Sequence, residues 1–198
     1  ENLAATFQFP LIELGYNATL SLYHSRVRNT VSHNRSQESA VKAFDAVFEG
    51  GLYVDTAVLR DSTVGQALKA GTFQVTETTV LGHVILDGNA DGTIRDVTCD
   101  GVIARAYDGG NEAPSRVRVL DSEIRPIDAA EYDEGSAVAV ANKHESVFEH
   151  CEIRGSIQTV GRLSQVGDFI SCTFQSDHDV DFYFDGNGGR EIYGNAFV

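Results

Sequence analysis

The sequence contains no methionine and no tryptophan, and it has only three residues each of proline, cysteine and lysine. Three cysteines cannot all pair with one another inside one chain, so a fold held together only by disulfides is not expected. No apolar run approaches the roughly 18 residues that a membrane-spanning helix needs, and no signal peptide is visible. A chain of 198 residues with these features is expected to form one domain.

Basic charge is also scarce, because 29 acidic residues accompany only 15 basic ones. A net charge of −14 would repel nucleic-acid phosphates, so a nucleic-acid partner is not expected. The charge gives no basis for binding an anionic membrane either. An acidic, lysine-poor, arginine-retaining composition resembles that of proteins from extreme halophiles. We therefore expect a protein of haloarchaeal or haloarchaeal-virus type, and an ordinary acidic secreted protein is the alternative.

The sequence is rich in self-similarity, which is clearest around Ile153. Phe148 lies five residues before Ile153, Cys151 lies two residues before it, and Gly155 lies two residues after it. With Ile153 as the anchor, the same offsets fit copies anchored at Val80, Cys99, Ile124, Phe174 and Phe197. A looser copy consists of Val58, Asp61, Thr63 and Gly65, and an early copy consists of Leu22, Ser25, Val27 and Asn29.

The anchors are 19 to 29 residues apart, which indicates a constant strand followed by connections of variable length. Offsets −2 and 0 share one strand face because side chains alternate, whereas offset −5 needs a bend or bulge to point inward as well. A second short apolar run follows most copies, at 84–86, 102–103, 137–140, 156–157 and 180–184. Units this small bury their apolar faces only by stacking. The repeat therefore predicts an all-β fold, a right-handed parallel β-helix that forms a single-stranded solenoid of about six or seven rungs.

The stretches Glu149–Gly155 and Glu191–Phe197 resemble repeats of the pectin-lyase-like superfamily of right-handed parallel β-helices. The resemblance covers residues 55–198 well and residues 1–54 loosely. That superfamily includes polysaccharide lyases, hydrolases, viral spikes and non-catalytic modules, so the resemblance implies an architecture and leaves the function open.

We expect one continuous domain, with an N-terminal cap and first irregular rungs in residues 1–54 and a regular β-helix in residues 55–198. The absence of methionine and the interruption of the last repeat at Val198 favour a segment of a longer chain. The long excursions at 107–115 and 127–135 are expected to leave from different corners of neighbouring rungs, and loops on a rigid scaffold are frequent sites of function.

The repeat also accounts for the cysteines. Cys151 and Cys172 occupy offset −2 with other small residues, and Cys99 is itself an anchor. Free cysteine behaves as a small buried hydrophobe, so three buried thiols are expected. A disulfide between Cys151 and Cys172 is the alternative, since strands about 4.8 Å apart place Cα atoms near the short end of the range for that bond.

One candidate metal site is the stretch from Asp87 to Gly92, which matches the first half of a calcium-binding loop. Asp87, Asn89 and Asp91 would supply oxygen ligands at alternate positions, as Ca²⁺ requires. Thr98, however, stands where a bidentate glutamate is expected. Asp185-Gly-Asn187 lies seven residues before Ile192, as Asp87 lies seven before Ile94, so a repeated tight turn is the competing interpretation.

A second candidate is the carboxylate cluster Asp177, Asp179 and Asp181, which would share one face of a strand. With a nearby arginine such as Arg154, this cluster could form a catalytic site, and a solvated surface cluster is the simpler interpretation. Arg125-Pro126 resembles an element of pectate lyases whose companion residues are missing here. His150, at offset −3, is expected to point outward from a strand.

These observations favour a non-catalytic structural or binding module of an extracellular surface or viral spike or fibre protein, presenting loops to glycans or partner subunits. The alternative is a polysaccharide lyase or glycoside hydrolase of the β-helix superfamily. No cofactor is expected apart from the candidate Ca²⁺, and a homo-oligomer stays open. The location is expected to be extracellular, at a cell surface or in a virion. The glycosylation sequons Asn17-Ala-Thr19 and Asn34-Arg-Ser36 are consistent with that location.

Overall fold

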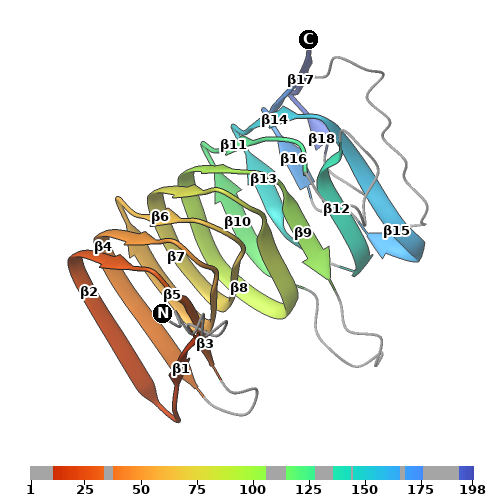
Figure 1. Cartoon of the computed structure of the whole chain (residues 1–198). Coiled ribbons are helices and arrows are strands. Elements are labelled where there is room, and N and C mark those ends of the chain that lie inside the picture. Colours follow the sequence, from red (N-terminus) through yellow and green to blue (C-terminus); the bar gives the residue numbers. More distant parts are fainter. Residues whose placement is uncertain are drawn as a thin grey trace, which may run out of the picture.

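The computed structural model describes residues 11–33, 38–105, 115–127, 136–143, 145–165, 168–175 and 192–198. These residues form an all-β solenoid of stacked rungs, as the repeat predicts. Strands of successive rungs lie side by side along the solenoid from the N-terminal to the C-terminal end (Figure 1). The pairings between them are parallel, as the prediction of a parallel β-helix requires. The described residues include no helix, and so none that could cross a membrane.

Each rung contributes to three faces of the solenoid. The first face ends just before the bend in each repeat, and the second face carries the anchor residue. The third face follows about four residues later. Some strands are confined to one face. The first face holds β10 (Arg116–Leu120), β13 (Val147–Glu149), β16 (Asp168–Ile170) and β18 (Ile192–Tyr193). The second face holds β6 (Thr63–Val64), β11 (Glu123–Ile124), β14 (Glu152–Arg154), β17 (Thr173–Gln175) and β19 (Ala196–Phe197). The third face holds β1 (Leu11–Leu14), β3 (Thr30–His33), β9 (Val102–Arg105), β12 (Ser136–Lys143) and β15 (Ser156–Gln165).

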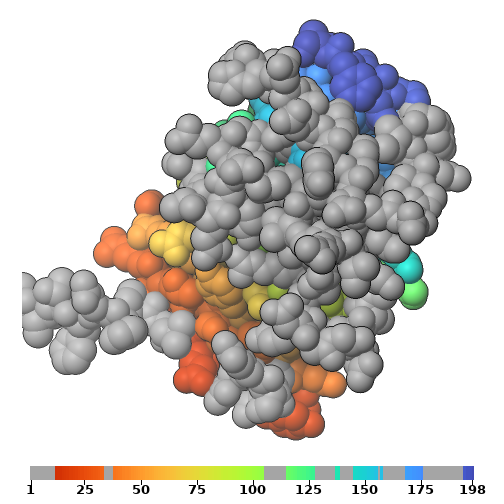
Figure 2. Space-filling view, turned by 90° about the vertical axis from the view of Figure 1, so that its right-hand side faces the viewer, coloured from red at the N-terminus to blue at the C-terminus, as the bar shows by residue number. Residues whose placement is uncertain are grey.

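The remaining strands continue around one or two corners of a rung. β2 (Ala18–Val27) and β4 (Ser39–Phe48) run through the first and second faces, and β5 (Leu52–Arg60) joins the third face to the first. β7 (Leu68–Val80) and β8 (Val84–Cys99) each pass through all three faces. Figure 2 shows the N-terminal rungs and the C-terminal residues at opposite ends of the molecule.

The predicted anchors stack in one column, here called the anchor column. Its members are Val27, Phe48, Val64, Val80, Cys99, Ile124, Ile153, Phe174 and Phe197. The early copy anchored at Val27 is confirmed. The looser copy is wrong by one residue, because Val64 rather than Thr63 stacks on Val80. Leu59, Ser62 and Val64 are buried there. Gly65 lies one residue beyond Val64, and not at the offset of two residues that the looser copy gives it.

A left-handed residue at offset −3 lets offsets −5, −2 and 0 all point inward. This position forms a second column, here called the outer column: His24, Asp45, Asp61, Glu77, Asp96, Asp121, His150, Ser171 and Gly194. The φ angles lie between 44° and 69°. Aspartate and histidine are among the non-glycine residues that adopt this conformation most readily. One such residue inserted in a strand moves the side chains that follow it to the other face, as a β-bulge does. The predicted bend is therefore confirmed.

The core runs along the inside of the solenoid and is formed mainly by aliphatic and phenylalanine side chains. Phe148 and Phe169 lie on adjacent rungs with their rings stacked, 4.9 Å between centroids. Phe174 and Phe197 stack in the same way at 5.3 Å. Their side chains are buried except at the last rung, where Phe197 is 59 % exposed.

Candidate functional site

The calcium candidates lie in strand β8, not in a separate tight turn. Asp87 to Ala90 are inserted at the corner between the third and first faces, opposite the single residue Gly71 of β7. Asn89 and Gly92 both have positive φ, which turns the chain around this corner. The insertion explains why the anchor spacing grows at this rung. The left-handed Asn89 at the corner is the backbone feature that the turn interpretation requires, here within a continuous strand.

The three candidate calcium ligands have different surroundings. The carboxylate of Asp87 is paired with the ammonium of Lys69 on the preceding rung. Asn89 and Asp91 are exposed, and Ala90 between them is buried. Within the described ranges, no three His, Cys, Asp or Glu side chains are grouped to hold a metal. A calcium site at Asp87, Asn89 and Asp91 therefore stays a prediction.

Of the second candidate site, only Arg154 belongs to the described residues. Asp177, Asp179 and Asp181 lie outside the described residues, as does the apolar run 180–184. Arg154 lies on β14, about half-exposed, with Nη2 2.9 Å from Oε1 of Glu152. Its Nε is 3.4 Å from Oε1 of Glu123 on the preceding rung. The partners that the structure shows for Arg154 are thus glutamates of the second face.

Arg125, noted for its place beside Pro126, also has a carboxylate partner. Its Nη2 lies 2.7 Å from Oδ1 of Asp100, one rung earlier. Its buried Nε has no hydrogen-bond partner among the described atoms. Arg125 therefore belongs to the pattern of cross-rung ion pairs.

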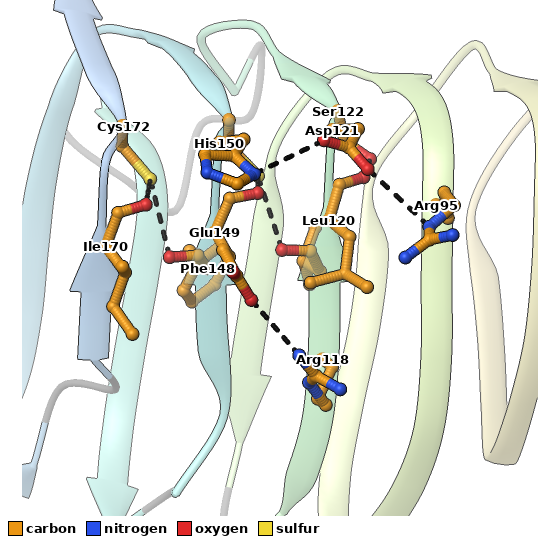
Figure 3. A network of polar contacts seen from close by, with 12 residues as sticks. Arg95, Arg118, Leu120, Asp121, Ser122, Phe148, Glu149, His150, Ile170 and Cys172 are labelled. Carbon is orange, nitrogen blue, oxygen red and sulfur yellow. Dashed lines mark hydrogen bonds and ion pairs between the residues drawn. The ribbon is translucent and has the colours of Figure 1, made fainter.

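A ladder of exposed ion pairs lies around the outer column (Figure 3). Asp121 lies between two partners on neighbouring rungs: Arg95 Nε is 3.5 Å from its Oδ2, and His150 Nδ1 is 3.5 Å from its Oδ1. A parallel contact joins Arg118 to Glu149 at 3.1 Å. His150 points outward as predicted, but it occupies the left-handed bend and not a regular strand position.

The inside of the same bend carries a second ladder. Offset −2 forms a third column, here called the inner column: Ser25, Ala46, Ser62, Thr78, Val97, Ser122, Cys151, Cys172 and Asn195. Ser122 Oγ donates to the carbonyl of Leu120 at 2.6 Å and accepts from the backbone N–H of Val97, one rung earlier, at 3.1 Å. Asn195 accepts from the N–H of Cys172 at 2.7 Å and donates to the carbonyl of Phe169 at 3.0 Å.

The inner column thus satisfies backbone groups that the bend takes out of the regular ladder. A buried N–H without a partner costs about 1–3 kcal/mol, and small hydroxyl or amide side chains at offset −2 remove that cost. The sequence showed the small residues of this column, but the hydrogen bonds between rungs follow only from the stacking.

The cysteines are buried free thiols, as predicted. Sγ of Cys151 donates to the carbonyl of Val119 at 3.4 Å, and Sγ of Cys172 donates to the carbonyl of Phe148 at 3.4 Å. Contact with the Cys172 thiol, followed by burial, raises the pKa of Cys151. Burial raises the pKa of Cys99 to about 12. Cys99 and Cys151 are therefore protonated and unreactive at neutral pH.

The described residues thus form a solenoid with hydrogen bonds along the inside of its bend and ion pairs along the outside. Comparison of the chain with protein-family models, with curated proteins and with solved structures found no match in any of the three.

Proposed function

We propose that this chain is a non-catalytic structural or binding module at the outside of a cell or virion, presenting loops to glycans or partner subunits. The observation that carries the proposal is the continuous anchor column from Val27 to Phe197, which keeps successive rungs in one register. A scaffold of this kind holds the connections between its strands at fixed spacing, and such connections are where binding residues gather.

The positions of the two long connections support this role. Segment 106–114 follows the end of β9, and segment 128–135 precedes the start of β12. β9 and β12 are stacked neighbours on the third face, with Val102 opposite Val138. Arg105 and Ser136, the described residues that flank these segments, therefore lie at opposite ends of that face on adjacent rungs.

The composition supports an exterior, high-salt setting. The net charge is −14, and many of the few arginines are engaged in cross-rung ion pairs on the surface. We include a haloarchaeal or haloarchaeal-virus origin in the proposal for this reason. An increase in the melting temperature between low salt and molar KCl would support it.

The proposal is tested by replacing segments 106–114 and 128–135, separately and together, with short Gly-Ser linkers. Each variant is assayed on an array of acidic and neutral polysaccharides, for retention and for release of reducing or unsaturated ends. We expect the intact chain to be retained without releasing ends. The linker variants should lose retention while keeping cooperative unfolding.

Turnover would support the alternative, a polysaccharide lyase or hydrolase. In that case Asp177→Asn, Asp179→Asn or Asp181→Asn should abolish the release of ends, and Arg154→Gln should lower it. Release of ends by the intact chain would overturn the non-catalytic proposal. Retention that survives both linker replacements would overturn the role of the loops.

A further inference from the structure

The connection between β1 and β2 is a tight turn that ends at Asn17, and the sequon Asn17-Ala-Thr19 runs from this turn into the start of β2. The backbone N–H of Ala18 donates to the carbonyl of Gly15 at 3.1 Å, which closes the turn. Asn17 has φ of 52°, a left-handed conformation that asparagine tolerates better than most residues. We propose that Asn17 is the attachment site of an N-linked glycan. The inference rests on the exterior location proposed above, and not on a binding role.

Both side chains that the sequon requires are accessible. Asn17 and Thr19 are exposed, and neither side chain hydrogen-bonds to another described residue. Tyr16 beside them is 69 % exposed. A Cβ placed at Gly15 would meet no atom within 4 Å, so there is open space on this side of the turn. A bulky glycan on Asn17 therefore fits the folded chain without displacing the core.

The modification is a glycosyl transfer whose co-reactant is an oligosaccharide linked to a lipid diphosphate. The carboxamide nitrogen of Asn17 forms a bond to C1 of the first sugar, and the bond from C1 to the diphosphate oxygen breaks. The amide loses one proton, and the lipid diphosphate leaves with the bonding electrons. No oxidant or reductant is needed. The hydroxyl of Thr19 is the second element of recognition by the transferring enzyme.

The turn lies where a glycan would shield the edge of β2 from pairing with other chains. Asn17 directly precedes β2, a ten-residue strand that pairs with β4 on one side and with no other described strand. Strand edges of this length invite pairing with other chains. A hydrophilic glycan at the start of β2 would hinder that approach. It would also leave the inward-facing residues of β2 in contact with the core.

The experiment is expression through a eukaryotic secretory pathway, followed by intact-mass measurement before and after an amidase that removes N-glycans. All variants carry Asn34→Gln, which removes the second sequon. We expect one glycan on this background and none on Thr19→Ala or Asn17→Gln. Thr19→Ser, which restores a sequon hydroxyl, should carry the glycan again.

Thr19→Ala is a safe control for folding, because the residue opposite Thr19 on the next rung is Ala40. A secreted protein with cooperative unfolding and an unmodified Asn17 would overturn the proposal. So would a glycan on Asn17 that abolishes cooperative unfolding. Neither readout depends on retention by polysaccharides, so failure of the proposed function would leave this test unaffected.

Discussion

The inner and outer columns occupy adjacent residues of the same bend, yet they use opposite chemistry. Ser122 is buried and hydrogen-bonds to the backbone of its own rung and of the preceding one. Asp121, one residue earlier, is exposed and pairs with Arg95 and His150 at nitrogen–oxygen distances of 3.5 Å. Buried hydrogen bonds are costly to remove, whereas exposed ion pairs contribute little. The comparison teaches that side-chain hydrogen bonds stabilise the bend from its inside, whereas on its outside the left-handed backbone matters more than the ion pairs.

The largest expected effect concerns pH and the buried thiol of Cys99. Its pKa is raised from an ordinary 9.0 to about 12 by burial, so the folded state keeps a proton that the unfolded state releases. The contribution of the thiol to stability is complete below pH 9 and is lost as the pH rises toward 12. Between these two pH values, the free energy of unfolding should fall by about 1.4 kcal/mol per pH unit because of this thiol.

This prediction is checked by urea unfolding of the intact chain and of Cys99→Val, at several pH values from about 8 to about 11. Valine suits the site because Val80 and Ile124 are its neighbours in the anchor column. The free energy of unfolding should fall more steeply with pH for the intact chain. Equal slopes for the two proteins would contradict the predicted role of Cys99.

The next effect is the loss of one inner-column hydroxyl. Ser122→Ala leaves the buried N–H of Val97 without its partner, which should lower the free energy of unfolding by about 1–3 kcal/mol. Ser122→Cys should lose less, since cysteine occupies the same column at the next rung. Equal losses for alanine and cysteine would show that the hydrogen bond is not what stabilises this position.

A smaller effect is expected at the backbone of the outer column. Asp96 is exposed and has φ of 51°. Asp96→Val forces a β-branched residue into the left-handed region, with an expected cost of about 1–2 kcal/mol. Asp96→Asn should stay within about 0.5 kcal/mol of the original chain. A tolerated valine would mean that the bend relaxes when its residue changes, and thermal unfolding of the two variants decides this.

The smallest effect is expected for the ion pairs. Arg118→Ala removes the partner of Glu149, and 58 % of the Arg118 side chain is exposed. The expected loss is about 0.2–1 kcal/mol, and it should shrink as salt is added. A double-mutant cycle with Glu149→Gln isolates the pair. A coupling energy above about 2 kcal/mol would contradict the prediction, because the ion pair would then stabilise the fold as much as a buried hydrogen bond of the inner column.

Much of the architecture was predictable because apolar residues recur at fixed offsets. The anchors from Val80 to Phe197 and the early anchor Val27 all stack as the repeat indicated. The error at Thr63 arose where two neighbouring residues fit the pattern almost equally well. In a strand, a shift of one residue exchanges inside for outside, so only the stacking of Val64 on Val80 could resolve it.

The candidate sites were less predictable. Lys69 and Asp87 are 18 positions apart in sequence and meet only because their rungs are stacked. The same holds for Arg154 and Glu123. The outer column does carry a signal in the sequence: aspartate or histidine at offset −3 in six of its nine positions indicates a left-handed residue.

The sequence by itself determined that this chain is a stack of similar rungs, since a small unit with one apolar face must bury that face against its neighbours. It also determined most members of the anchor column, from Val80 to Phe197 and at Val27. Only the tertiary structure decided which side chains on different rungs meet, because connections of variable length separate contacting residues by 16 to 32 positions. The hydrogen bonds of the inner column and the ion pairs of the outer column are properties of that stacking.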